Sequence, residues 1–138
     1  MKYRYLVTSN RDLNKPHFRR PIVDVEIFGP KGSINTIALL DSGADNCLFN
    51  IGYAELIGID LAKCEKAVTT SVEGGMKDVY LTNIVIRVKG LEKISVPIAF
   101  IDSDSVNGLL GQIGFFDQNK IKFERDHDIF EINPVKKK

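Results

Sequence analysis

The sequence is poor in the features that mark several common protein classes. It has two cysteines, Cys47 and Cys64, too few for a disulfide scaffold, so both are expected to be reduced thiols. The two histidines, His17 and His127, stand at no spacing that would join them to these thiols in a zinc motif, and we expect no metal site and no cofactor. With 19 Lys and Arg against 18 Asp and Glu, the net charge of +1 favours neither nucleic acid nor an anionic membrane as partner.

Long apolar runs are also absent. No stretch approaches the roughly 20 apolar residues of a membrane span, and residues 1–30 contain no signal-peptide core. These absences predict a cytoplasmic protein. A length of 138 residues corresponds to one domain. We expect an N-terminal strand or arm over 1–21, a folded domain over 22–133 and a basic tail over 134–138.

Residue preferences favour strands over helices, since 16 Ile and 11 Val stand against 11 Leu. Apolar patterning on both sides of a turn at 29–33 predicts a β-hairpin over 22–40. A second hairpin is expected from strands at 63–72 and 76–89, because Gly74 and Gly75 favour a tight turn. The remaining expected elements are a weaker strand at 3–7, a strand at 93–101, a terminal hairpin at 120–132, and short helices at 51–58 and 112–118. Together they predict a mostly β fold with a closed or curled sheet.

One short motif carries chemistry. Residues 41–43, Asp-Ser-Gly, place a carboxylate where the second strand of the first hairpin ends. With this composition such a triplet is expected by chance roughly 0.08 times, and on its own it is also ordinary turn chemistry. Its context adds weight, because two apolar residues precede Asp41 and a second apolar-apolar-glycine step follows at 109–111. The glycine-tipped hairpin lies between the two.

These three elements, in this order, resemble the retropepsin-like aspartic proteases, the single-lobed relatives of pepsin, over about residues 20–132. The resemblance implies a closed, all-β acid-protease barrel with a flap hairpin and one or two short helices. It also implies that Ser42 hydrogen-bonds across a dimer axis and that Gly43 lets the two loops approach closely. The implied site residues are Asp41, Ser42 and Gly43 for catalysis, Ala44, Asp45, Gly74 and Gly75 for substrate binding, and Leu109, Leu110 and Gly111 for structural support.

Peptide hydrolysis without a metal or a covalent intermediate needs a base for the attacking water and an acid for the carbonyl. Two adjacent carboxylates supply both, because they cannot ionise together, and aspartic proteases are the standard example. This chain has one such triplet, since Asp102 and Ser103 are followed by Asp104 rather than glycine. We therefore predict a homodimer in which each copy supplies one Asp41, acting as an endopeptidase on extended peptide or protein substrates.

One position departs from the family pattern. Retroviral members carry an arginine after the apolar-apolar-glycine step, and it pairs with the aspartate that matches Asp45, whereas this chain has Gln112. Asp45 is then either a solvated loop carboxylate or the partner of another residue, for example Arg125. Two alternatives stay open: a non-catalytic peptide-binding or dimerisation module of the same fold, and an unrelated β-barrel with Asp41 in an ordinary turn.

Overall fold

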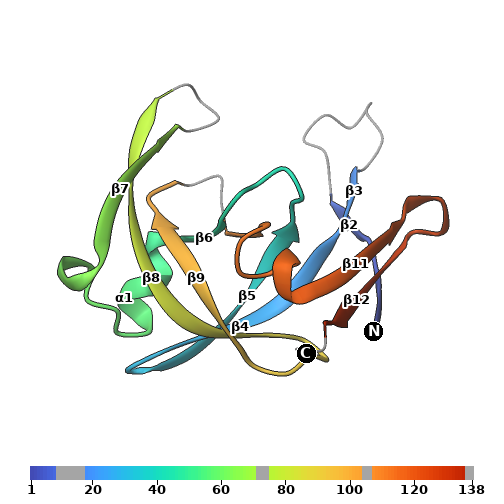
Figure 1. Ribbon diagram of the computed structural model, residues 1–138, viewed down its shortest axis with the longest axis horizontal. Helices are drawn as coiled ribbons and strands as arrows, with labels where there is room; N and C mark the ends of the chain where they lie inside the picture. The colour runs from blue at the N-terminus through green and yellow to red at the C-terminus, as the bar shows by residue number, and fades with distance from the viewer. Residues whose placement is uncertain (9–17, 71–74, 104–106, 136–138) are drawn as a thin grey trace.

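The computed structural model describes residues 1–8, 18–70, 75–103 and 107–135, in which strands dominate (Figure 1). The elements are β1 (Lys2–Arg4), β2 (Leu6–Thr8), β3 (Phe18–Arg20), β4 (Ile22–Gly29), β5 (Gly32–Leu40), β6 (Cys47–Asn50), α1 (Ile51–Leu56), the 3₁₀ helix η1 (Leu61–Lys63), β7 (Glu65–Thr70), β8 (Met76–Val88), β9 (Ile94–Ile101), β10 (Gly108–Leu110), the 3₁₀ helix η2 (Phe116–Gln118), β11 (Asn119–Glu124), the 3₁₀ helix η3 (Arg125–His127) and β12 (Ile129–Pro134).

Six of the strands close into a barrel. Their hydrogen-bonded order is β4-β5-β10-β6-β9-β8, and β8 returns to β4 through pairs such as Ile86 with Ile27. The strand β7 pairs antiparallel with residues 76–81 of β8, on the edge opposite β9. The two strands rise from the barrel at the left of Figure 1. The prediction of a closed all-β sheet is therefore confirmed.

Alternation along the strands decides which side chains face the barrel interior. In β4, Val23, Val25 and Ile27 are buried, and in β8 Ile84 and Ile86 are buried, while the residues between them are more exposed. Successive side chains of a strand point to opposite faces, so one face of each strand lines the core. Removing this apolar surface from water is the main term that stabilises the barrel.

The predicted helix at 51–58 is present as α1. Asn50 caps it, because its side chain accepts a hydrogen bond from the Gly52 amide (2.9 Å). The chain leaves the helix at Gly58, whose φ of +81° lies in the region that glycine tolerates best. Neither α1 nor any other helix in the described ranges is long and apolar enough to cross a membrane.

The predicted helix at 112–118 is wrong, because only its last three residues form a 3₁₀ turn, η2. The amides of Gln112 and Ile113 donate to carbonyls of the 41–46 loop and not to their own segment. Gly114 then adopts a φ of +97°, which no α-helix accommodates. The positive φ of Gly114 therefore ends any α-helix before it can form, and the segment folds as turns instead.

The predicted strand at 3–7 is divided at Tyr5. On one side of it, β1 pairs with β12, and on the other, β2 pairs with β3. The Tyr5 amide donates to the Asp128 carbonyl (3.0 Å) at the point where the chain changes sheet. The N-terminal segment is thus joined to the terminal hairpin of its own chain, β11–β12.

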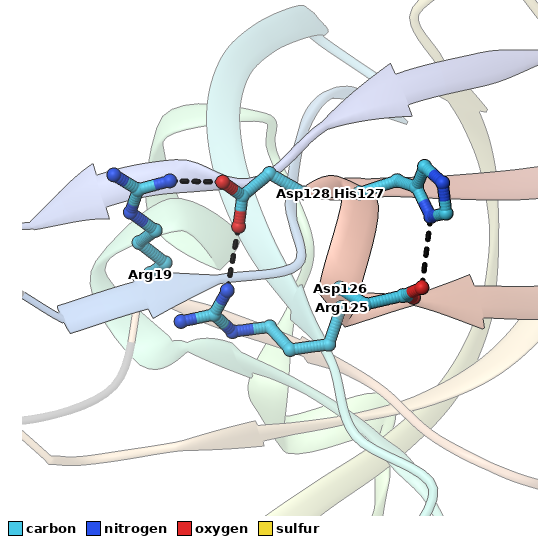
Figure 2. A network of polar contacts seen from close by, with 5 residues as sticks. All are labelled: Arg19, Arg125, Asp126, His127 and Asp128. Atoms are coloured by element: carbon cyan, nitrogen blue, oxygen red, sulfur yellow. Dashed lines mark hydrogen bonds and ion pairs between the residues drawn. The ribbon is translucent and has the colours of Figure 1, made fainter.

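Asp128 also ties β3 to the turn of the terminal hairpin (Figure 2). Its carboxylate accepts hydrogen bonds from Arg125 (2.6 Å) and from Arg19. On the same turn, His127 Nδ1 lies 2.9 Å from Asp126 Oδ2. All of these side chains are substantially exposed, so each pair is expected to contribute at most about 1 kcal/mol. Apolar packing between the N-terminal strand β1 and the terminal hairpin is expected to contribute more than these ion pairs.

That packing centres on Phe130, which has no exposed surface and stacks on Tyr3 with ring centroids 5.3 Å apart. We expect Phe130→Ala to lower the free energy of unfolding by about 3–5 kcal/mol. Phe123 is its cross-strand partner and is 40% exposed, so Phe123→Ala is the matched control, with an expected loss below about 1.5 kcal/mol. Chemical denaturation of both variants measures the difference. Equal losses would contradict a dominant role for Phe130 in holding the N-terminal segment.

Candidate functional site

Asp41 opens the loop that joins β5 to β6. Leu40, the last residue of β5, is buried, and it lies beside Leu110 in the parallel pairing of β5 with β10. The Asp41 amide donates to the Leu110 carbonyl (3.0 Å), while its side chain is partly exposed. The loop lies on the same side of the barrel as the raised ends of β7 and β8 (Figure 1). Two buried leucines thus hold the strand end that presents the carboxylate.

The carboxylate of Asp41 is held by its own loop. Oδ1 accepts a hydrogen bond from the Gly43 amide (2.9 Å), and the Asp41 carbonyl accepts one from the Ala44 amide (3.1 Å). This is the Asx-type turn expected for the Asp-Ser-Gly triplet. Ser42 and Gly43 are exposed at its apex. The turn therefore orients the carboxylate at an exposed part of the loop.

The second apolar-apolar-glycine step lies directly against this loop. The Gln112 amide donates to the Ala44 carbonyl (2.9 Å), and the Ile113 amide donates to the Asp45 carbonyl (2.8 Å). These bonds join segments far apart in sequence, and they extend the contact between Asp41 and β10. The structure thus brings together the two motifs that the sequence analysis singled out.

Gly111 is the residue that permits this approach. A Cβ atom there would lie 2.5 Å from the Asn46 carbonyl oxygen and 2.6 Å from that of Ala44. The buried Cys47 also joins the loop to residues 111–113. Its Sγ accepts a hydrogen bond from the Gly111 amide (3.4 Å) and donates one to the Ile113 carbonyl (3.6 Å). Burial raises the pKa of the Cys47 thiol, so it acts in these bonds as a neutral group.

Gln112 reaches the loop with its side chain as well. Its Nε2 donates to the Ser42 carbonyl (2.7 Å) and not to Asp45. The suggested pairing of Asp45 with Arg125 is wrong, because Arg125 bonds to Asp128. Asp45 is exposed, and within the described ranges its carboxylate forms no ion pair. Of the two expectations for Asp45, the solvated loop carboxylate agrees with these contacts.

A row of apolar side chains runs from the Asp41 strand toward the foot of β7 and β8. Directly paired residues share one face of a sheet, so register identifies the row. Leu48 and Leu81 of this row pack with buried Val79, Ala99 and Ile101 in a cluster separate from the main core. In order of cross-strand pairing, the row consists of Leu39, Leu109, Leu48, Ala99 and Leu81. The sequence motifs contain two of these residues, Leu39 and Leu109, and miss the other three, because alternation along one strand does not reveal which strands become neighbours.

Several residues singled out from the sequence lie away from this loop or outside the described residues. Gly74 and His17 fall outside the described residues, and Gly75 is exposed just before β8. His127 is paired with Asp126 at the turn of the terminal hairpin. In the part of the chain that the structure describes, no group of three or more His, Cys, Asp or Glu residues could hold a metal ion.

Comparisons with known proteins bear on both fold and family. A family model described as aspartyl protease matches residues 23–112. A retropepsin-like aspartic protease from Rickettsia conorii superposes with a TM-score of 0.63 at 14% identity, covering 94% of this chain and 97% of that one. The retroviral protease-like domain of Ddi1 from Leishmania major gives 0.60 at 17% identity, covering 84% and 90%. No curated protein matches the sequence. The predicted retropepsin-like fold is confirmed.

Because only glycine fits against the loop at position 111, we expect Gly111→Ala to lower the free energy of unfolding by about 1–3 kcal/mol. The atoms in the way are backbone carbonyls, which cannot rotate aside. Gly52→Ala is the matched control, since its Cβ would lie 3.2 Å from Asn50 Oδ1 and alanine is the better helix former. It should change stability by less than about 1 kcal/mol. Thermal unfolding compares the two, and an equally mild effect at position 111 would contradict the close approach.

Proposed function

Because this chain belongs to the aspartyl protease family, we propose that it is an endopeptidase whose active site is completed by a second copy of the chain. The observation that carries the proposal is a single Asp-Ser-Gly triplet per chain, with Asp41 presented by a loop that backbone hydrogen bonds to residues 110–113 hold in place. The chemistry needs two carboxylates, and a two-fold axis at this loop supplies the second one from an identical site.

In the proposed dimer, one Asp41 is ionised and the other is protonated, because two adjacent carboxylates repel each other when both are charged. The ionised carboxylate takes a proton from a water molecule, which attacks the peptide carbonyl carbon. The protonated carboxyl donates its proton to the carbonyl oxygen, which gives a tetrahedral intermediate with two hydroxyl groups. The first Asp41 then passes the proton taken from water to the nitrogen as the C–N bond breaks, and the second Asp41 takes a proton back from one hydroxyl as the new carboxyl group forms. Ser42 and Gly43, exposed at the loop apex, are proposed to contact the partner loop. Gly43 also holds one oxygen of Asp41 through its amide.

The surface around the loop supports association with a second copy. Ile113 is 51% exposed, although its amide is bonded to the Asp45 carbonyl beside the candidate site. An exposed aliphatic side chain on a residue bonded to the Asp41 loop is suited to burial between two identical surfaces. We propose that Ile113 belongs to this interface.

The apolar row that includes Leu109 and Leu48 supports an extended peptide as substrate. Both side chains are only partly buried and lie on the strands adjoining Asp41. A peptide placed across them would bury its own apolar side chains beside the reacting bond. Gly74 and Gly75 are proposed to form the tip of a flap over this peptide, with Ala44 and Asp45 beside its backbone.

We expect Asp41→Asn to abolish cleavage, with kcat/KM falling by at least about 10²–10⁴-fold, because an amide can neither accept nor deliver the proton. Its Oδ1 can still accept from the Gly43 amide, so the loop should fold normally. Wild type and variant are incubated with a peptide library from acidic to neutral pH, and products are read by mass spectrometry. Asp60→Asn is the control, because Asp60 caps η1 and lies outside the loop.

Cleavage that survives Asp41→Asn would overturn the role of Asp41. Extended peptides that bind to the wild-type protein, yet stay uncut at every pH tested, would favour a peptide-binding module of the same fold.

A shared site makes activity depend on association. We expect the activity per chain to fall on dilution below the dimer dissociation constant, in step with the dimer fraction measured by sedimentation. Excess Asp41→Asn chains should also inhibit wild-type chains, because mixed dimers carry one catalytic carboxylate in place of two. A monomer with constant activity per chain would refute the shared site.

A further inference from the structure

We propose that Gln112 is a positioning residue for Asp41, and that it acts through the peptide group between Ser42 and Gly43. This inference rests on the proposed function, because it concerns how the carboxylate of that site is held. The retroviral arginine at this position pairs with a carboxylate, whereas the amide of Gln112 reaches the Ser42 carbonyl.

Two hydrogen bonds meet at a single peptide group. The Nε2 atom of Gln112 donates to the Ser42 carbonyl oxygen (2.7 Å), and the Gly43 amide donates to Asp41 Oδ1 (2.9 Å). That carbonyl and that amide belong to the same planar unit, so fixing the oxygen also fixes the direction of the N–H. A donor bonded to the carbonyl further polarises the peptide group and strengthens its N–H as a donor.

Gln112 is itself held firmly enough to transmit this restraint. Its amide donates to the Ala44 carbonyl (2.9 Å), and its carbonyl accepts from the Asp117 amide (3.1 Å). The preceding residue, Gly111, is buried against the carbonyls of Ala44 and Asn46. The side-chain amide therefore extends toward Ser42 from a backbone that is bonded on both sides.

A neutral amide is well matched to this task. The Ser42 carbonyl is a neutral acceptor, and a glutamine donor satisfies it without bringing a charge beside the carboxylate of Asp41. It also requires no counter-ion, which agrees with Asp45 being exposed and forming no ion pair within the described ranges. Gln112 thus orients Asp41 through the dipole of the Ser42–Gly43 peptide group.

The test compares Gln112→Met, which keeps length but has no donor, with Gln112→Lys, which restores an N–H donor of sufficient reach. We expect Gln112→Met to lower kcat by about tenfold with KM changed less than about twofold, because a misplaced catalytic group affects the transition state more than binding. Gln112→Lys should recover most of the kcat lost with the missing donor, but it should shift the pH profile of kcat to lower pH, because its positive charge favours ionised Asp41. Gln118→Met is the matched control, since its Nε2 bonds to Gly114 at 2.7 Å, away from the loop, and it should leave kcat unchanged.

A second readout does not depend on activity. Removing the Gln112 donor should move the Gly43 amide proton resonance upfield in the full-length protein, and Gln118→Met should not. Wild-type kcat in Gln112→Met with an unmoved Gly43 resonance overturns the inference and leaves the proposed function standing. A wild-type protein that cleaves nothing overturns the proposed function. The shift of the Gly43 resonance in Gln112→Met then still tests whether Gln112 positions Asp41 through the Ser42–Gly43 peptide group. Loss of stability without either change assigns Gln112 a purely structural role and also overturns the inference.

Discussion

The parallel pairing of β5 with β10 is the constraint on which the candidate site depends. It places the end of one strand beside a segment 70 positions away, at the distance of a hydrogen bond between Ser42 and Gln112. Closing so long a loop costs chain entropy, which the burial of Leu40 and Leu110 in the barrel offsets. The local turn holds Asp41 Oδ1 on the Gly43 amide, whereas the position of this turn beside residues 110–113 is a consequence of barrel closure.

Hydrogen bonds from neutral donors, rather than ion pairs, hold this loop. The described ion pairs lie elsewhere and each has at least one exposed partner, as at Glu26, where the Ser33 hydroxyl and the exposed Arg87 guanidinium hold the pKa of the carboxyl below its usual value. Around Asp41 the donors are backbone amides and one side-chain amide. Such bonds contribute about 0.5–1.5 kcal/mol each, and their value here lies in the direction they impose. A site of this kind orients its carboxylate without surrounding it with charge.

The strands and the chemical motif could be predicted well, and the reasons are local. Alternation in 22–40 reports burial of one face, which is what a barrel strand requires, and the Asp-Ser-Gly triplet is a turn by its own geometry. The predicted helix at 112–118 failed because Gly114 has a φ of +97°, which no α-helix accommodates. The pairing of Asp45 with Arg125 failed because Arg125 bonds to Asp128, three residues further along the same hairpin turn.

The sequence by itself determined the all-β class, the carboxylate at the end of a buried strand and the presence of one such motif per chain. Periodicity and turn chemistry act over a few residues, so they can be read without knowing the fold. Only the tertiary structure decided that Gln112 reaches Ser42, that Gly111 lies against two loop carbonyls and that Leu48 joins Leu109 and Ala99 in one row. These contacts depend on strand order and register, which the closing of the whole barrel selects.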